Sequence, residues 1–193
     1  GIADQAIGQG FVAESVRLII NGRVRAKIPL GRIGAGISPY PYLFVLEQSQ
    51  NEALLHNKIV AQGGNVQWGM ALAEVREMAS GYSGALARHD GSQEEFECRY
   101  LIGCDGASSV VRHFLGMPFR GGTDEKLFFV ADIDMEAGVE KEGLLLAINK
   151  SEFLGFFPMS RARQYRVIGV LPSSITDPEN IPFGTLKDHI ETN

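Results

Sequence analysis

The chain has 193 residues, a formal net charge of −5 at pH 7 and a hydrophobic share of 45%. This composition is ordinary for a globular protein and leaves room for one or two hydrophobic cores. The acidic balance and the lack of a Lys/Arg cluster argue against a nucleic-acid partner, and no apolar stretch approaches the roughly 20 residues that cross a membrane.

The spacing of cysteine and histidine indicates neither a disulfide framework nor a metal centre. Cys98 and Cys104 are the two cysteines, and neither they nor the four histidines have the spacing of metal ligands. No signal-peptide pattern opens the chain. The expected compartment is therefore a reducing cytoplasm.

The first elements are the tail of a helix and a β-hairpin. We expect the helix to end at Gly8 or Gly10. Hydrophobic and polar residues then alternate over residues 14–30, which is the period of a strand with one buried face. Asn21-Gly22 interrupts this alternation and is a residue pair that a tight hairpin turn prefers. The expected hairpin has one buried face and one basic, solvated face.

A loop, a short strand and a helix are expected next. The loop is rich in Gly and Pro and covers residues 31–42, and the strand covers residues 43–46. Ser49 and Glu52 have the spacing of a capping box, with Ser49 as the cap. This spacing predicts a helix that runs to about Gln62.

The following segment has the alternation of strands. We expect short strands at residues 66–68 and 71–78. Asp90-Gly91 predicts a hairpin turn between residues 85–89 and residues 95–99.

Four further strands are expected in the last third of the chain, at residues 127–135, 144–148, 153–158 and 165–171. They are expected to join the first hairpin in one mixed or antiparallel sheet. Because other elements lie between the hairpin and these strands, the order predicts two interleaved subdomains. A helix begins near Phe183, and both chain ends suggest a segment of a longer polypeptide.

The stretch at residues 100–112 is the most informative. Leu101-Ile102 predicts a buried inner strand, and Asp105-Gly106 predicts a sharp turn at its carboxyl end, where ligands bind in open α/β sheets. Ser108 or Ser109 can cap the short helix that follows. An acid, a glycine and a helix N-terminus together predict a site for ribose hydroxyls and phosphate.

This stretch resembles the Asp-Gly fingerprint of the single-component flavoprotein aromatic hydroxylases, the para-hydroxybenzoate hydroxylase family. Tyr100 and Ser108 depart from it, because the family has charged residues there. The matching positions are Leu101, Ile102, Gly103, Cys104, Asp105, Gly106, Ser109, Val111 and Arg112. Other patterns of the family follow in the same order between residues 14 and 171, such as Gln48 with Glu52 and the run Leu115-Gly116-Met117-Pro118-Phe119.

The resemblance implies a flavoprotein monooxygenase that uses FAD and NAD(P)H to hydroxylate a small aromatic substrate through a flavin hydroperoxide. No nucleic-acid or membrane partner is expected, on the charge and hydropathy given above. The residues that it implies for binding the cofactor are Gln48, Asp105, Gly106, Ser109 and Arg112.

The implied fold class is α/β to α+β, with part of a Rossmann-like FAD domain interleaved with a substrate domain built on a mixed or antiparallel sheet. The sheet would wall the substrate pocket, for which Phe156, Phe157 and Pro158 are the candidate residues. No catalytic acid or base is assigned. The expected domain parts are residues 1–42 (helix tail and hairpin of the substrate domain), 43–119 (part of the FAD domain, with the Asp-Gly motif), 120–175 (substrate-domain sheet) and 176–193 (start of the next helix).

Two parts of the family pattern are missing. Gly8-Gln9-Gly10 has the relaxed spacing of a glycine-rich phosphate loop, but no hydrophobic strand precedes it. The later Gly-Asp motif is absent. We therefore expect an internal fragment that binds FAD weakly or not at all by itself and does not turn over. Two alternatives stay open: a non-catalytic domain that binds a small molecule or a partner chain, and a related flavoprotein such as a halogenase, an epoxidase or a reductase.

Overall fold

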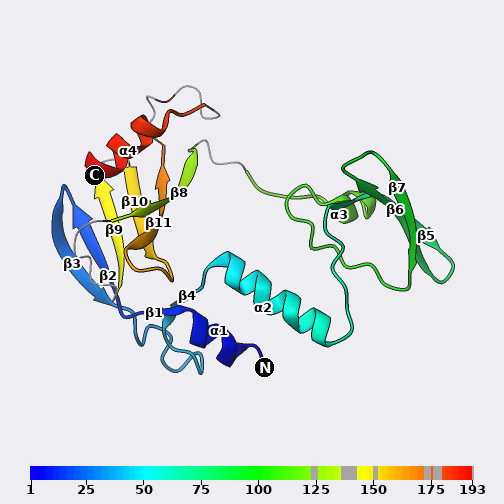
Figure 1. Ribbon diagram of the computed structural model, residues 1–193, viewed down its shortest axis with the longest axis horizontal. Helices are drawn as coiled ribbons and strands as arrows, with labels where there is room; N and C mark the ends of the chain where they lie inside the picture. Colours follow the sequence, from blue (N-terminus) through cyan, green and yellow to red (C-terminus); the bar gives the residue numbers. More distant parts are fainter. Residues whose placement is uncertain (123–125, 136–142, 150–151, 172–174, 176–179, 193) are drawn as a thin grey trace. The chain divides into compact units, whose positions relative to one another are not determined.

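The computed structural model describes residues 1–122, 126–135, 143–149, 152–171, 175 and 180–192. The chain divides into two compact units (Figure 1). The first unit consists of Gly1–Gln62 and Asp124–Asn193, and the second consists of Gly63–Thr123. The second unit is therefore inserted into the sequence of the first.

A mixed six-stranded sheet organises the first unit. Its strand order is β3-β2-β9-β10-β11-β8, and β2 pairs with β9 in parallel while the other neighbours are antiparallel. This sheet confirms the expectation that the first hairpin joins the later strands. The strands are β2 (Ser15–Ile20), β3 (Arg23–Pro29), β8 (Phe128–Asp134), β9 (Gly143–Asn149), β10 (Glu152–Pro158) and β11 (Gln164–Val170).

The hairpin of β2 and β3 forms at the predicted turn. Asn21 and Gly22 have φ angles of 51° and 69°, the positive values that a type I′ turn requires at both positions. The prediction of a buried face is wrong for β3, where Val24 and Ile28 are exposed. The physical reason is that β3 is an outer strand of the sheet, with a neighbour on one side only.

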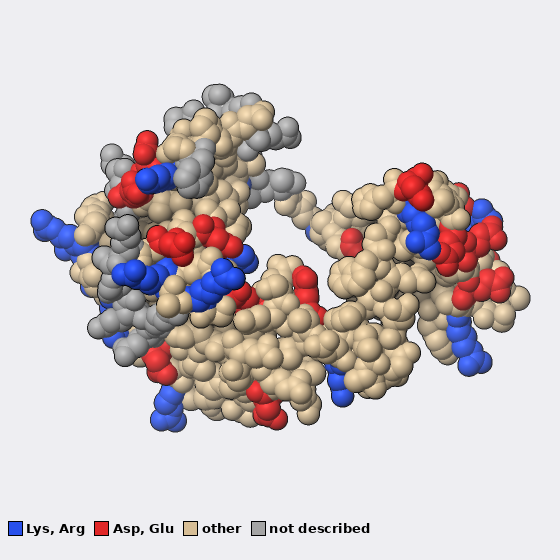
Figure 2. Space-filling view, in the orientation of Figure 1, with Lys and Arg blue, Asp and Glu red and all other residues tan. Residues whose placement is uncertain are grey.

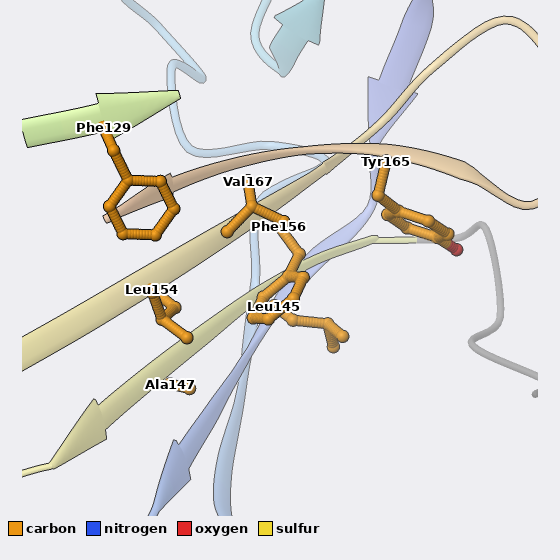
Figure 3. Packing of buried hydrophobic residues seen from close by; sticks show 7 residues of the cluster. All are labelled: Phe129, Leu145, Ala147, Leu154, Phe156, Tyr165 and Val167. Carbon is orange, nitrogen blue, oxygen red and sulfur yellow. The ribbon is translucent and has the colours of Figure 1, made fainter. Parts of the chain in front are cut away.

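The main core lies on one face of this sheet (Figure 3). Its buried members are Phe129, Leu145, Ala147, Leu154, Phe156, Tyr165 and Val167. Helix α4 (Phe183–Thr192) covers part of the cluster through Leu186 and Ile190. The residues come from β8, β9, β10 and β11, so the core joins these four strands.

A second, smaller cluster contains Ala13, Leu30 and Leu144. It joins the sheet to a two-stranded antiparallel ribbon of β1 (Phe11–Ala13) and β4 (Leu43–Val45). The two helices that flank this ribbon in the sequence are α1 (Ala3–Gln9) and α2 (Gln48–Ala61). Helix α1 ends at Gly10, one of the two predicted positions.

The predicted capping box of α2 is wrong. The cap position is Glu47, whose backbone is extended and whose carbonyl accepts the Asn51 N–H. Ser49 is therefore already inside the helix. The Gln48 side chain instead donates a hydrogen bond of 2.8 Å to Glu52, one turn further on.

The second unit holds a three-stranded antiparallel sheet of β5 (Met70–Met78), β6 (Gly81–Arg88) and β7 (Gln93–Cys98), together with the short helix α3 (Val110–Phe114). The predicted Asp90-Gly91 turn lies between β6 and β7. Acidic side chains gather on this unit (Figure 2), and β7 contributes Glu94, Glu95 and Glu97 to its composition. The expected strand at residues 66–68 does not form.

None of the helices in the described part of the chain is both long and apolar enough to cross a membrane. No group of three or more His, Cys, Asp or Glu side chains in that part of the chain is arranged to hold a metal ion.

The sheet core should dominate the stability of the first unit. Leu154 is 1% exposed, so Leu154→Ala leaves a cavity and should lower the free energy of unfolding by about 2–5 kcal/mol. The matched control is Ile37→Ala, because Ile37 is 88% exposed and its change should stay within about 0.5 kcal/mol. Urea unfolding followed by circular dichroism measures both. Equal losses would contradict the assignment of the core.

Candidate functional site

The segment that leads into the Asp-Gly turn is not paired with any strand. Residues 100–106 belong to no strand, and Tyr100 and Ile102 are 79% and 83% exposed. The prediction of a buried inner strand is therefore wrong here. Burial of Leu101-Ile102 requires neighbouring strands, and no described residue pairs with this segment.

The Asp105 carboxylate binds the start of α3. Its Oδ1 accepts a hydrogen bond from the Ser109 hydroxyl, and its Oδ2 accepts the backbone N–H groups of Val110 (2.7 Å) and Val111 (3.3 Å). An ionised carboxylate has about four acceptor positions, so one remains for a further donor. Asp105 thus holds the turn closed and still has capacity for one ligand hydroxyl.

These hydrogen bonds lower the pKa of Asp105. The largest cause is the Ser109 hydroxyl, burial opposes it, and the backbone N–H groups of Val111 and Val110 reinforce it. The pKa of Asp105 is lower in the folded state than in the unfolded state. The ionised carboxylate therefore stabilises the folded protein fully at any pH above the unfolded-state pKa, and this stabilisation is lost as the pH falls through the folded-state pKa. The carboxylate is therefore charged at neutral pH.

Ser109 caps α3, as one of the two alternatives predicted. Its hydroxyl accepts the Arg112 N–H at 3.0 Å while it donates to Asp105, and the residue is buried. Gly106 has a φ angle of 77°, a left-handed conformation that a residue with a side chain rarely adopts. The helix ends before Gly116, whose φ is 63°.

Arg112 has unused donors. Its Nη2 donates to the Ala107 carbonyl at 3.1 Å and lies 2.8 Å from His113 Nε2, and its guanidinium lies 4.8 Å from the centre of the Phe119 ring. Its Nε and Nη1 atoms are buried and have no hydrogen-bond partner among the described residues. Buried donors without a partner are costly, and an anionic ligand would satisfy them.

The structure brings four of the predicted cofactor residues together. Asp105, Gly106, Ser109 and Arg112 form one continuous turn and helix start in the second unit. Gln48 belongs to the first unit, where it is exposed and bonded to Glu52. Its role toward a cofactor stays a prediction.

The three predicted pocket residues lie on β10 but face different ways. Phe156 belongs to the main core, whereas Phe157 packs against the smaller cluster on the other face. Pro158 lines a cavity of about 250 Å³ in the first unit. The apolar part of the cavity wall also includes Phe11, Val45 and Met159.

A charged group beside this cavity was not predicted from the sequence. Glu47 lines the cavity and accepts the Ser160 N–H at 2.6 Å. Nearby, Arg166 of β11 donates two hydrogen bonds to Asp132 of β8, at 2.8 and 2.9 Å. The pairing of β8 with β11 sets Arg166 opposite Asp132, and the sequence alone does not show that these two residues meet.

Residues 1–188 of the chain match the family described as FAD binding domain. The chain is 30% identical over 128 residues to a 12-dehydrotetracycline 5-monooxygenase/anhydrotetracycline 6-monooxygenase of Streptomyces rimosus, a match that covers 66% of this chain and 25% of the relative. It is 24% identical over 184 residues to a 6-methylpretetramide 4-monooxygenase of Streptomyces rimosus, covering 94% of this chain and 32% of the relative.

The chain therefore spans about a quarter to a third of the length of these curated relatives. Among solved structures, it resembles aklavinone-11 hydroxylase, which was solved with FAD and aklavinone. The TM-score is 0.78 at 20% identity, and the match covers 100% of this chain and 39% of the other. This likeness confirms the expected mixed α/β fold class.

Removal of the Ser109 hydroxyl should change the titration of Asp105. In Ser109→Ala, the largest cause of the lowered pKa is gone, so the pKa of Asp105 should rise toward its ordinary value. Ser108→Ala is the matched control, because Ser108 makes no hydrogen bond to that carboxylate. Carbon-13 NMR of the carboxyl group measures both titrations. An unchanged Asp105 pKa in Ser109→Ala would show that the bond does not form.

Proposed function

The chain belongs to the FAD binding domain family, and from this premise we propose that it forms part of an FAD-dependent monooxygenase that hydroxylates a small aromatic substrate. The observation that carries the proposal is the turn in which Asp105, Ser109 and Arg112 converge. The names of the two Streptomyces relatives support the type of reaction, since both are monooxygenases.

The residues of this turn fit a cofactor that carries phosphate and sugar hydroxyl groups. The buried Nε and Nη1 atoms of Arg112 suit a phosphate oxygen, and the remaining acceptor position of Asp105 suits a ribityl or ribose hydroxyl. Gly106 keeps the turn free of a side chain. When bound, FAD would supply the activation of molecular oxygen after reduction by NAD(P)H.

The protein itself would bind, orient and shield the reactants. We assign Asp105, Gly106, Ser109 and Arg112 to the cofactor, and Gln48 to the same cofactor on the strength of the family resemblance. The substrate would lie against the sheet of the first unit, where Pro158 lines the cavity. The reducing cytoplasm is the compartment in which we place the reaction.

We also propose that the 193 residues alone bind FAD weakly and do not turn over. The support is the missing glycine-rich phosphate loop, whose backbone N–H groups hold the pyrophosphate in proteins of this kind. If the gene encodes a longer polypeptide, that polypeptide is the form to assay for activity.

The assignment of Asp105 predicts a specific loss of FAD affinity. A hydrogen bond to a charged group is worth about 1.5–3 kcal/mol, so Asp105→Ala should weaken FAD binding by about tenfold to a hundredfold. Flavin fluorescence, titrated against the polypeptide that binds FAD, measures the dissociation constant.

The matched control for this variant is Asp90→Ala. Asp90 is also an exposed turn aspartate of the second unit, and its carboxylate accepts hydrogen bonds from Ser92. Its replacement should leave FAD affinity unchanged. Equal affinities in Asp105→Ala and the parent protein would defeat the proposed role of Asp105.

A further inference from the structure

The Arg112 side chain is held by neighbours on either side of it in the sequence. Its Nη2 atom lies 3.1 Å from the Ala107 carbonyl oxygen and 2.8 Å from Nε2 of His113, and its Cζ lies 4.8 Å from the centre of the Phe119 ring. The ring face orients the plane of the guanidinium, and the two polar contacts fix its rotation within that plane. These neighbours therefore determine where the other donors of Arg112 point.

The contact with His113 defines the form of the imidazole ring. An arginine side chain stays protonated and has only N–H donors, so its partner must be an acceptor. Nε2 of histidine accepts only when it carries no hydrogen, which places the ring hydrogen on Nδ1. The 2.8 Å contact therefore requires the neutral Nδ1–H tautomer, because a hydrogen on Nε2 would bring two donors together.

This hydrogen bond decides which donors of Arg112 remain for a ligand. The Ala107 carbonyl and Nε2 of His113 are two acceptors, and they match the two N–H bonds of Nη2. The Nε and Nη1 atoms are buried and have no partner among the described residues. Nη2 is thus engaged by the protein, and the other two nitrogens keep donors for an anionic group.

A carboxylate partner would have a different effect on the guanidinium. Arg166 shows this effect, since Asp132 occupies its Nε and Nη2 atoms together. Asp105 directs its oxygens at the Ser109 hydroxyl and at the first N–H groups of α3. Among the described residues Arg112 forms no ion pair. A neutral imidazole therefore holds this arginine through one atom and leaves its positive charge for a ligand.

We propose that His113 is a positioning residue for the cofactor: its Nε2 atom holds Nη2 of Arg112 so that Nε and Nη1 face a phosphate group of FAD. His113 itself is not a ligand of FAD. This inference rests on the proposed function, in which Arg112 binds the cofactor, and it adds the side chain that orients Arg112.

The first test uses the full chain without FAD. Long-range proton–nitrogen NMR of the His113 ring shows which nitrogen carries the hydrogen at neutral pH. We expect the hydrogen on Nδ1 and none on Nε2. A hydrogen on Nε2, in either the neutral or the charged ring, would overturn the proposal, since that atom could not accept from Arg112.

Two substitutions separate the acceptor from the shape of the side chain. His113→Leu removes the acceptor, whereas His113→Gln offers an amide oxygen, and both new residues favour a helix at least as well as histidine does. Loss of one hydrogen bond should weaken FAD binding about threefold to tenfold in His113→Leu, and His113→Gln should restore most of the affinity. Flavin fluorescence in the polypeptide that binds FAD measures both. Parental affinity in His113→Leu, or equal losses in the two variants, would overturn the proposed role.

The matched control is His89→Leu. His89 is also an exposed histidine of the second unit, and it directly follows β6 rather than lying in α3. Its replacement should leave FAD affinity unchanged. A loss as large as that in His113→Leu would show that the effect does not pass through Arg112, which would also overturn the proposal.

The outcomes separate this inference from the proposed function. Weakened FAD binding in Asp105→Ala together with full affinity in His113→Leu would defeat the positioning role alone. Arg112 side-chain signals that do not move on saturation with FAD would defeat the proposed function as well, whatever the tautomer of His113. If His113→Leu does not fold, the tautomer measurement on the parent chain can still overturn the proposal.

Discussion

The hydrogen bonds of the Asp105 carboxylate are the constraint on which the candidate site depends. They close the turn and hold the first residues of α3, and Ser109 connects them to the backbone of Arg112. The guanidinium of Arg112 is thereby held between the Ala107 carbonyl and the Phe119 ring. One charged side chain therefore positions both the acceptor and the donors that we assign to FAD.

The mixed sheet of the first unit brings together residues that are distant in the sequence. The parallel pairing of β2 with β9 sets Leu18 opposite Leu146 and places the first hairpin beside the later strands. The bond from Ser160 to Glu47 joins residues that are 113 positions apart. The cavity that Glu47 and Ser160 line lies where these two distant parts of the chain meet.

The sequence predicted most of what short-range chemistry decides. The turns at Asn21-Gly22 and Asp90-Gly91 and the Ser109 cap depend on neighbouring residues, and the family resemblance is confirmed by the match over residues 1–188. The predictions that were wrong concern features that tertiary contacts decide. Leu101-Ile102 has strand character but no strand beside it, and β3 lies at a sheet edge. Glu47 could not be identified as a cavity residue because its partner follows a distant strand.

The central claim is that the turn from Asp105 to Arg112 contacts FAD. The most direct measurement is nitrogen-15 NMR of the Arg112 side chain during titration with FAD, in the polypeptide that binds the cofactor. The account predicts that the Nε–H and Nη–H signals of Arg112 shift as FAD binds, since their buried donors gain an anionic partner. Saturation with FAD that leaves these signals unmoved would contradict it.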